Sequence, residues 1–275
     1  MIQMKKAKII VLAGQSNAVG VGHVEYLPRH FDADTVAKFK IGYENIHINY
    51  FSHDKKSNGF VPTRTGCTEV SKDTLGPEAG IAQTLDSKYQ GEEFFIVKCA
   101  FGGTNLNHDW LPPSCGGDYN EYARAEGEHY RKAGWCYNEL VDIMDKSISE
   151  LKFRQYLPEI IAFCWMQGES DADTQEHVAG YSARYEALLS DFAEKFGSYF
   201  NNCIFVDGGI SEIWPLCREM NEVKKSLAEK ADNRFYIDTI AQGLTTKNEP
   251  EPEFDAAHYD SDCTVKLGNL FAERI

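Results

Sequence analysis

The chain has 275 residues, of which 43% are hydrophobic and 12% aromatic, so it is long enough to bury a sizeable core and is not disordered as a whole. It carries 28 Lys and Arg residues against 42 Asp and Glu residues, and the net charge of −14 argues against a general binder of nucleic acid or of anionic membranes. No apolar run approaches the roughly 18 residues that span a bilayer, and the first residues leave no room for a signal peptide, so we expect one soluble, cytoplasmic domain over 1–275, or a secreted one if a leader has been removed.

Five short apolar runs indicate strands. Each run is almost continuously apolar, as parallel strands that are covered on both faces should be. In chain order the runs are Ala7–Gly14, Glu93–Phe101, Glu159–Met166, Cys203–Asp207 and Arg234–Thr239.

Helical periodicity occupies the intervals between the later runs, because apolar residues recur there at spacings of three and four. The predicted helices cover 140–151, 178–196 and 220–227, and a further helical segment, 261–274, ends the chain. Alternating strands and helices predict an α/β fold, a three-layer α/β/α sandwich with a central, mainly parallel sheet of about five strands, joined by right-handed crossovers as in flavodoxin-like proteins.

Two stretches interrupt the alternation. Residues from about 36 to 74 hold only weak strand signals, such as Ile46–Phe51, and we expect them to make an excursion from the sheet. Residues 102–134 form a second excursion with six glycines, two consecutive prolines and the aromatics Trp110, Tyr119 and Tyr122. A loop of this length inside a compact domain is usually functional, and its aromatic side chains favour a pocket wall.

The eight cysteines include no pair separated by two to four residues, which argues against zinc-ribbon and thioredoxin-like sites. Cys99, Cys164 and Cys203 lie in apolar runs, so we expect them to be core thiols. Cys115, beside two glycines, is expected to be exposed.

Polar and Gly-rich residues gather where the predicted strands end. In an open α/β sheet the site lies outside the carboxyl ends of the strands, so this edge is where chemistry is expected. The four segments concerned are Gly14–Asn17, Phe101–Asn105, Gln167–Asp171 and Asp207–Gly209.

Ser16 follows a buried strand at a glycine turn, where an exposed hydroxyl could meet a base and the N–H of the turn could face an oxyanion. The alternative is that Ser16 or Asn17 caps the next helix, since both residue types are common caps. Ala18 stands where the hydrolase motif G-x-S-x-G has its last glycine, which disfavours an α/β-hydrolase in the strict sense.

Asp255 and His258 lie three residues apart, just before the last helical segment. A carboxylate at this offset can accept from Nδ1–H of the imidazole and leave Nε2 free to take a proton from a serine. The alternative is a surface aspartate beside a solvated histidine. The other histidines lack such an acid on a comparable turn, and His108 in the glycine-rich loop is the second histidine to consider; the set comprises His23, His30, His47, His53, His108, His129 and His177.

The segments that follow the second and third predicted strands offer groups for an oxyanion or a metal. Gly102–Asn105 could supply a backbone N–H or form an ordinary tight turn, and Gln167 could donate from a neutral amide. Glu169 and Asp171 favour the start of a helix. A calcium loop would use Glu169, Asp171 and Asp173, but Thr174 and Gly180 replace the required glycine and glutamate, which disfavours the metal site.

Four segments together resemble the SGNH (GDSL-like) hydrolase superfamily. The resemblance is to its branch of sialate O-acetylesterase-like and acetyl xylan esterase-like proteins, carbohydrate esterase family 6. The matching segments are Leu12–Asn17, Lys98–Thr104, Trp165–Asp171, and Asp255–His258 followed by Leu267-Gly268. The Gln-Gly-Glu-Ser-Asp stretch with its upstream Trp is the most specific, and Gly-Gln-Ser-Asn is next.

The resemblance implies a catalytic triad with Ser16 as nucleophile, His258 as general base and Asp255 as the orienting acid. It also implies an oxyanion hole made of the N–H of Ser16, the N–H of Gly103 and the side chain of Gln167, where the wider superfamily has Asn. Gln15, Asn17 and Glu169 are possible supporting residues, and Glu169 is a minor rival for the acid role. Ala18 departs from the Met that most members have after Gly-Gln-Ser-Asn, and this affects packing more than chemistry.

The implied function is a serine carbohydrate O-acetylesterase that removes acetyl groups from sugars through an acyl-enzyme, without a metal or an organic cofactor. The alternatives are a non-catalytic carbohydrate-binding protein on the same scaffold and a serine hydrolase of other small esters or thioesters. The acidic composition mildly favours neutral acetylated sugars over sialylated ones, although Arg124 or Arg131 could build a local basic pocket. The sequence does not determine the oligomeric state.

Overall fold

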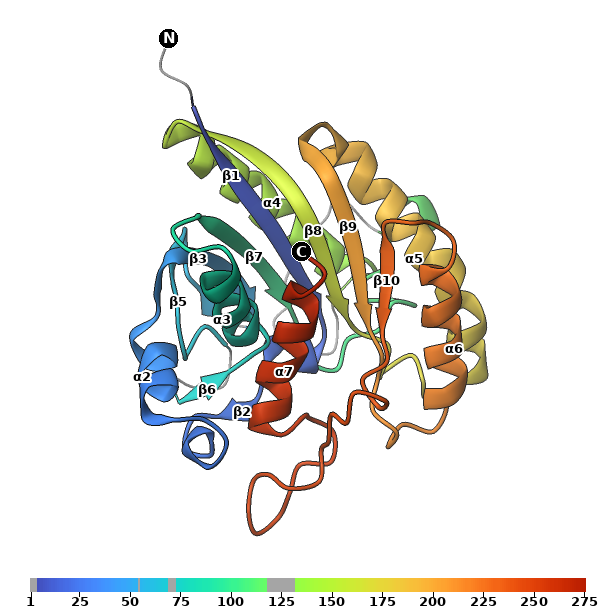
Figure 1. Cartoon of the computed structure of the whole chain (residues 1–275). Helices are drawn as coiled ribbons and strands as arrows, with labels where there is room; N and C mark the ends of the chain where they lie inside the picture. The colour runs from blue at the N-terminus through green and yellow to red at the C-terminus, as the bar shows by residue number, and fades with distance from the viewer. Residues whose placement is uncertain (1–3, 54, 69–72, 118–131) are drawn as a thin grey trace.

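The computed structural model describes residues 4–53, 55–68, 73–117 and 132–275, and its centre is a sheet in the order β10-β9-β8-β1-β7-β3-β4, with β5 pairing with β3 (Figure 1). The strands from β10 to β3 are parallel to their neighbours. They are β1 (Lys5–Gly14), β3 (Tyr43–Ser52), β7 (Phe94–Ala100), β8 (Tyr156–Met166), β9 (Phe200–Gly208) and β10 (Arg234–Ile237).

Short strands complete the architecture. Two of them, β4 (Lys55–Lys56) and β5 (Val61–Thr63), run antiparallel to β3 at the edge of the sheet. A separate antiparallel pair joins β2 (Gly22–His23) to β6 (Thr74–Leu75).

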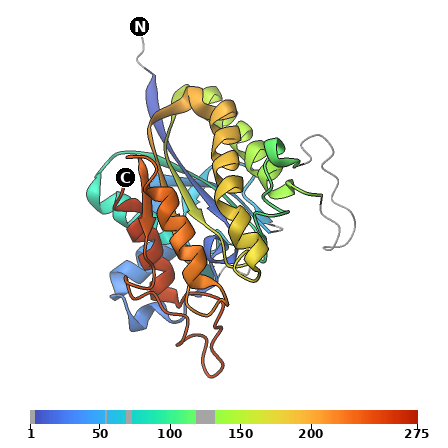
Figure 2. The ribbon, with the colours of Figure 1, turned by 90° about the vertical axis from the view of Figure 1, so that its right-hand side faces the viewer.

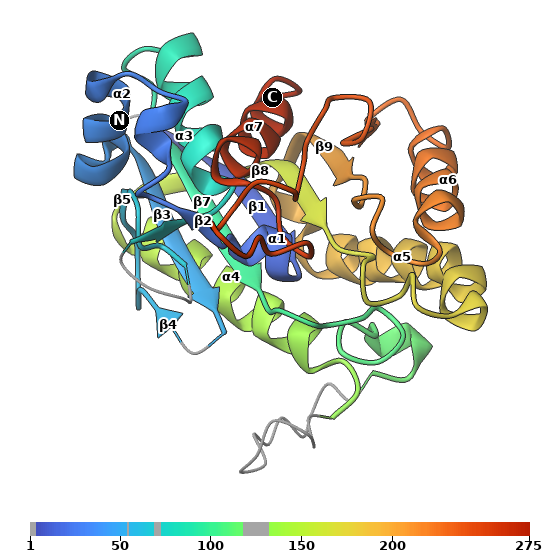
Figure 3. The same cartoon turned by 90° about the horizontal axis from the view of Figure 1, so that it is seen from below.

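Helices cover both faces of the sheet, with α3 and α7 on one side and α4 and α5 on the other (Figure 3). Figure 2 shows α5 and α7 on opposite sides of the strands. The helices are α1 (Ser16–Val19), α2 (Ala33–Ile41), α3 (Glu78–Lys88), α4 (Trp135–Phe153), α5 (Gln175–Phe196), α6 (Cys217–Ala228) and α7 (Ser261–Ala272), with 3₁₀ turns η1 (Leu27–Arg29), η2 (Pro113–Cys115) and η3 (Gly197–Tyr199).

The predicted α/β/α sandwich is confirmed, but the sheet is larger than predicted. Among the described residues it has eight strands rather than about five. The excursion expected over 36–74 is wrong for β3, which pairs in parallel with β7 from Ile46↔Phe94 to Ser52↔Ala100. The apolar pattern of this strand is weak because several of its residues are polar. Hydrogen bonds to other segments allow these residues to be buried; for example, Nδ2 of the buried Asn49 donates to Ser147 Oγ at 2.8 Å.

Close contact between α3 and α7 fixes the helix that follows the Asp255–His258 turn. A Cβ on Gly80 would lie 1.9 Å from the carbonyl oxygen of Val265, and a Cβ on Gly268 would lie 1.9 Å from that of Pro77. Only glycine permits this approach, so the two helices pack backbone against backbone. The weak apolar periodicity of α3 is therefore compensated by a contact that the local sequence does not show.

The cysteines lie as predicted. Cys99, Cys164 and Cys203 are buried, Cys115 is exposed, and all four are free thiols. Burial raises the pKa of the Cys99 thiol well above its ordinary value, which is expected of an inert core residue. Within the described ranges, no helix combines the length and apolar character that crossing a bilayer requires.

Candidate active site

The segments that follow β1, β7 and β8 meet the Asp255–His258 turn at one edge of the sheet, onto which Figure 3 looks. A cavity of about 420 Å³ lies there. Its lining comprises Gln15, Ser16, Val19, Val21, His53, Gly102, Gly103, Ser170, Trp214, Ala257 and His258.

Ser16 begins α1 immediately after a sharp turn at the end of β1. Gly14 has a φ of +145°, and a Cβ on it would lie 1.9 Å from the carbonyl oxygen of Met166 on β8, so only glycine fits. The N–H of Gln15 then donates to that same carbonyl at 2.9 Å. The half-buried Ser16 side chain faces the cavity, and its N–H donates no hydrogen bond within the described residues, as expected of the first turn of a helix.

His258 and Asp255 form the contact that their spacing predicts. Nδ1 of His258 lies 2.5 Å from Oδ2 of Asp255, and the His258 side chain is 24% exposed. Burial raises the pKa of Asp255, but the hydrogen bond from His258 and its charge outweigh burial, so the pKa of Asp255 lies below its ordinary value. Ser16 and His258 line the same cavity, although no hydrogen bond joins them in the part of the chain that is described.

Asn17 ties the histidine turn to α1. Its Oδ1 accepts from the N–H of Tyr259 at 3.1 Å, and its Nδ2 donates to the carbonyl of Ala257 at 3.3 Å and to Oε1 of Glu169 at 2.8 Å. On the other side the buried Tyr259 hydroxyl donates to the carbonyl of Gly209 at 3.2 Å. The backbone on both sides of His258 is therefore anchored.

Glu169, the minor rival for the acid role, is fully buried and does not line the cavity. Its Oε1 faces Asn17, and its Oε2 has no hydrogen-bond partner among the described residues. Burial raises the pKa of this carboxyl, although the hydrogen bond from Asn17 and the charge of His258 act in the opposite direction. The structure brings Asp255, rather than Glu169, to the imidazole.

Gln167, which the resemblance points to as an oxyanion donor, does not reach the cavity. It is fully buried, and its Nε2 lies 2.6 Å from Oδ2 of Asp171, 3.1 Å from the carbonyl of Thr104 and 3.3 Å from Oε1 of Gln15. The two amide hydrogens are thus engaged inside the protein. The sequence shows which residue type follows β8 but not the direction of its side chain.

The two glycines of the turn after β7 line the cavity, and their N–H groups differ in their partners. The N–H of Gly102 donates to Nε2 of His53 at 2.7 Å, whereas that of Gly103 makes no hydrogen bond within the described residues. Gly103 is exposed, has a φ of +65°, and has no atom within 4 Å of its would-be Cβ. The sequence gives no signal for His53, because no acid lies at a suitable offset and the strand that it follows, β3, is predicted to leave the sheet.

The aromatic wall predicted from the long loop is wrong for Trp110. This side chain is fully buried, and its Nε1 donates to Oγ1 of Thr104 at 2.9 Å. Trp214, which the sequence does not single out, lines the cavity instead. His108 is half exposed and lies outside the cavity lining. Four predicted contributors, Tyr119, Tyr122, Arg124 and Arg131, lie outside the described residues.

Glu169, Asp171 and Asp173 are not placed as a metal site. Oδ2 of Asp171 accepts from the N–H of Leu106 at 2.8 Å and from Gln167, while Glu169 faces Asn17. Throughout the described residues, no group of three or more His, Cys, Asp or Glu side chains is arranged to hold a metal ion.

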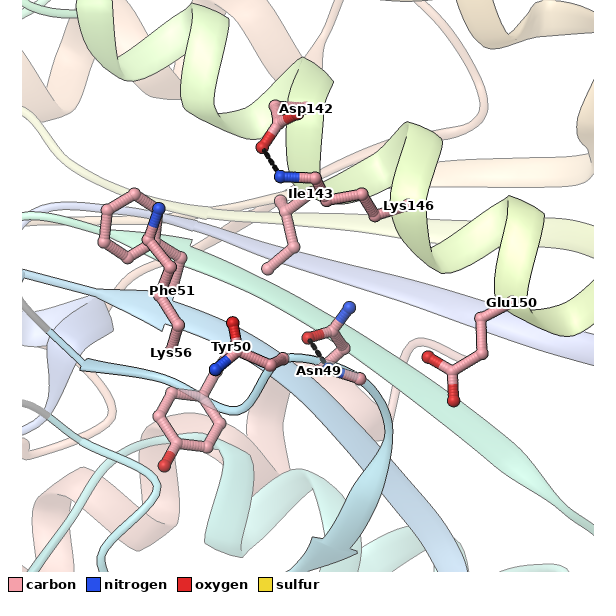
Figure 4. Close-up of a pocket in the computed structure, with 10 residues that line it drawn as sticks. Asn49, Tyr50, Phe51, Lys56, Asp142, Ile143, Lys146 and Glu150 are labelled. Carbon is pink, nitrogen blue, oxygen red and sulfur yellow. Dashed lines mark hydrogen bonds and ion pairs between the residues drawn. The ribbon is translucent and has the colours of Figure 1, made fainter.

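A second cavity of about 420 Å³ lies between β3 and α4 (Figure 4). Polar groups of its lining bind one another: Nζ of Lys146 lies 2.5 Å from Oδ2 of Asp142, and Oδ1 of Asn49 accepts from the N–H of Gly59 at 3.3 Å. The described residues that line it include no serine, cysteine or histidine. The nucleophile and base that the sequence predicts therefore meet in the other cavity.

The chain belongs to a known protein family. Residues 6–275 match the model of the family described as carbohydrate esterase, sialic acid-specific acetylesterase. No match was found among curated protein sequences.

Three solved structures share the fold. A protein from Arabidopsis thaliana superposes with a TM-score of 0.66 at 19% identity, covering 98% of this chain and 97% of the other. NanS superposes with a TM-score of 0.65 at 16% identity, covering 99% and 97%. A carbohydrate acetylesterase from Xanthomonas citri superposes with a TM-score of 0.62 at 12% identity, covering 97% of this chain and 55% of the other.

Proposed function

Because the chain belongs to the carbohydrate esterase family of sialic acid-specific acetylesterases, we propose that it removes acetyl groups from acetylated sugars by a serine mechanism with an acyl-enzyme intermediate. The observation that carries the proposal is that Ser16 and His258 line one cavity, while Asp255 lies at hydrogen-bond distance from Nδ1 of His258. These residues come from two ends of the chain, and they supply a nucleophile, a base and an orienting acid.

In the first half of the reaction, Nε2 of His258 takes the proton of Ser16 as its Oγ attacks the acetyl carbonyl. Asp255 accepts from Nδ1–H, which holds the tautomer that leaves Nε2 able to accept and stabilises the imidazolium that forms. The imidazolium then gives its proton to the departing sugar oxygen. The carbon–oxygen bond to the sugar breaks, and an acetyl group remains on Ser16.

In the second half, a water molecule gives a proton to His258 and attacks the acetyl-serine carbonyl; the bond between Oγ and the acetyl carbon then breaks, His258 returns the proton to Oγ, and acetate leaves. In both halves the carbonyl oxygen becomes an anion that needs preorganised donors. The N–H groups of Ser16 and Gly103 suit this purpose, since both residues line the cavity and neither N–H has a partner among the described residues. Gln167, the third donor implied by the resemblance, lies behind Gln15.

Acetate release tests the proposal. The substrates are acetylated xylan oligomers, acetylated neutral monosaccharides and O-acetyl sialic acid, each with and without a chelator. The negative net charge favours release from the neutral sugars. Ser16→Ala should fold and lose at least ~10⁴-fold in kcat, because the residual rate then comes only from binding and the oxyanion hole. An Ser16→Ala enzyme with a near-native rate would contradict the serine mechanism.

A fluorophosphonate probe separates the alternatives. An activated Ser16 displaces fluoride from phosphorus and becomes labelled, whereas a non-catalytic sugar-binding protein does not. Labelling of the wild type without acetate release from any sugar would favour a hydrolase of other small esters or thioesters. The absence of both labelling and acetate release would favour the non-catalytic sugar-binding protein.

A further inference from the structure

Gln15, the residue immediately before the nucleophile, lines the cavity and carries a side-chain amide. We propose that Nε2 of Gln15 is the side-chain donor to the oxyanion and that Gln167 is the positioning residue that holds it. This assignment rests on the proposed function and concerns which amide touches the reacting oxygen.

Hydrogen bonds fix the orientation of the Gln15 amide. Its Oε1 lies 3.1 Å from the backbone nitrogen of Ser170 and 3.3 Å from Nε2 of Gln167. A backbone N–H can only donate, so the atom that faces Ser170 must be the oxygen. The amide nitrogen therefore occupies the other branch of the side chain.

The amide nitrogen of Gln15 has no acceptor in the part of the chain that is described, so an acceptor for it would have to come from the cavity. Gln15 is 1% exposed, it lines the cavity, and its Nε2 makes no hydrogen bond among the described residues. Nε2 is not one of the polar atoms that are both fully buried and without a hydrogen-bond partner. Since it has no partner within the described ranges, some of its surface must be accessible. An almost buried N–H group without a protein partner is unfavourable by itself, and an oxyanion supplies the missing acceptor.

The Gln167 amide cannot donate to the reacting oxygen. Its Nε2 has two hydrogens, which are shared by three acceptors inside the protein, Oδ2 of Asp171 at 2.6 Å, the carbonyl of Thr104 at 3.1 Å and Oε1 of Gln15 at 3.3 Å, so neither hydrogen is left for the reacting oxygen. Turning the amide over would bring its oxygen against these acceptors, so the orientation is determined. Gln167 is fully buried and lies outside the cavity lining, where it can hold Gln15 but not bind substrate.

A neutral amide suits this position. It donates to a developing anion without giving up its proton, and it requires no change of charge during the reaction. Together with the N–H groups of Ser16 and Gly103, the Gln15 amide completes a set of three donors. The rigid attachment of Gln15 to Ser170 and Gln167 keeps it ready before substrate arrives.

Two substitutions at Gln15 test the assignment by steady-state kinetics of acetate release. Gln15→Met removes the donor at similar length, and we expect kcat to fall about 10²-fold with KM within about threefold, the loss typical of one oxyanion donor. Gln15→Glu keeps an oxygen for the Ser170 N–H but places a carboxylate beside the oxyanion, so its loss should be larger. The exposed Gln242→Glu makes the same charge change and should keep the wild-type rate.

A trifluoromethyl ketone gives a readout that a purely structural role would not move. The ketone adds to Ser16 and places an oxyanion in the hole, so Gln15→Met should weaken its binding by about the factor lost in kcat/KM, whereas KM for the ester changes little. Thermal unfolding of each variant reports its fold independently. If Gln15→Met does not fold, Gln15→Glu decides, since it keeps an acceptor for Ser170.

Three outcomes would overturn the assignment. A folded Gln15→Met enzyme with kcat within threefold of the wild type overturns it while leaving the proposed function intact. Loss of kcat in Gln167→Met without loss in Gln15→Met makes Gln167 the donor. A wild type that neither releases acetate nor reacts with the fluorophosphonate overturns the proposed function, and this assignment with it.

Discussion

Replacing Asn17 should both destabilise the protein and misplace His258, because its side chain makes three hydrogen bonds in a site that is 3% exposed. Hydrogen bonds to charged groups contribute ~1.5–3 kcal/mol and neutral ones ~1 kcal/mol, so the three bonds set an upper limit of about 5 kcal/mol. In Asn17→Ala the buried Glu169 loses the partner of its Oε1 and can take up a proton, which limits the penalty. We therefore expect a loss of about 2–4 kcal/mol in the free energy of unfolding.

The free energy of unfolding of Asn17→Asp should depend on pH in a way that Asn17→Ala does not. The new carboxyl would lie against Glu169, and two like charges at this distance raise the pKa of at least one group in the folded state. A pKa that is raised on folding means that the folded state binds more protons, so stability is retained at low pH and lost as the pH rises through the folded pKa. The deficit of Asn17→Asp should therefore be smaller at pH 5 than at pH 8.

Urea denaturation followed by tryptophan fluorescence measures both variants, with acetate release as the functional readout. Asn201→Ala is the matched control, because Nδ2 of Asn201 also donates to a glutamate, Oε2 of Glu159 at 2.9 Å, but on the exposed surface. It should change stability by no more than about 0.5 kcal/mol. If the free energy of unfolding of Asn17→Ala stayed within about 0.5 kcal/mol of the wild type, the size of a surface change, and the variant kept its kcat, Asn17 would neither stabilise the fold nor position His258.

Three other measurements follow from the same structure. Acetate release should fall in acid, since protonated His258 cannot accept the serine proton, and a rate that is flat from about pH 5 to 8 would contradict a histidine base. Lys224→Met removes the ammonium 2.7 Å from Oδ1 of the buried Asp207 and should cost ~3–5 kcal/mol in a denaturation curve. Burial already raises the pKa of Asp207 to about 6, and loss of the ammonium raises it further, so the deficit should be larger at pH 8 than at pH 5; an equal deficit would argue against the ion pair. Gly80→Ala should lower stability by at least about 1–3 kcal/mol because its Cβ would meet a carbonyl of α7 at 1.9 Å, whereas Gly197→Ala, with nothing within 4 Å, should not; equal effects would contradict the close helix packing.

Local pattern was sufficient for most of the sheet and for the position of the site along the chain. The five apolar runs became β1, β7, β8, β9 and β10, because parallel strands that are covered on both faces are apolar along almost their whole length. The strand β3 escaped prediction because its polar residues, such as Asn49, find partners on α4. The pairing of Asp255 with His258 was predictable because both lie on one short turn.

The sequence by itself determined which residues stand where the strands end, since strand and helix periods are local and a parallel sheet gathers its carboxyl ends at one edge. Only the tertiary structure decided where their side chains point. Asn17 reaches Glu169 across 152 residues of chain, Gln167 turns away from the cavity toward Asp171, and Oε1 of Gln15 accepts from the N–H of Ser170. The physical reason is that an amide is oriented by the donors and acceptors packed around it, and those come from segments that are distant in sequence.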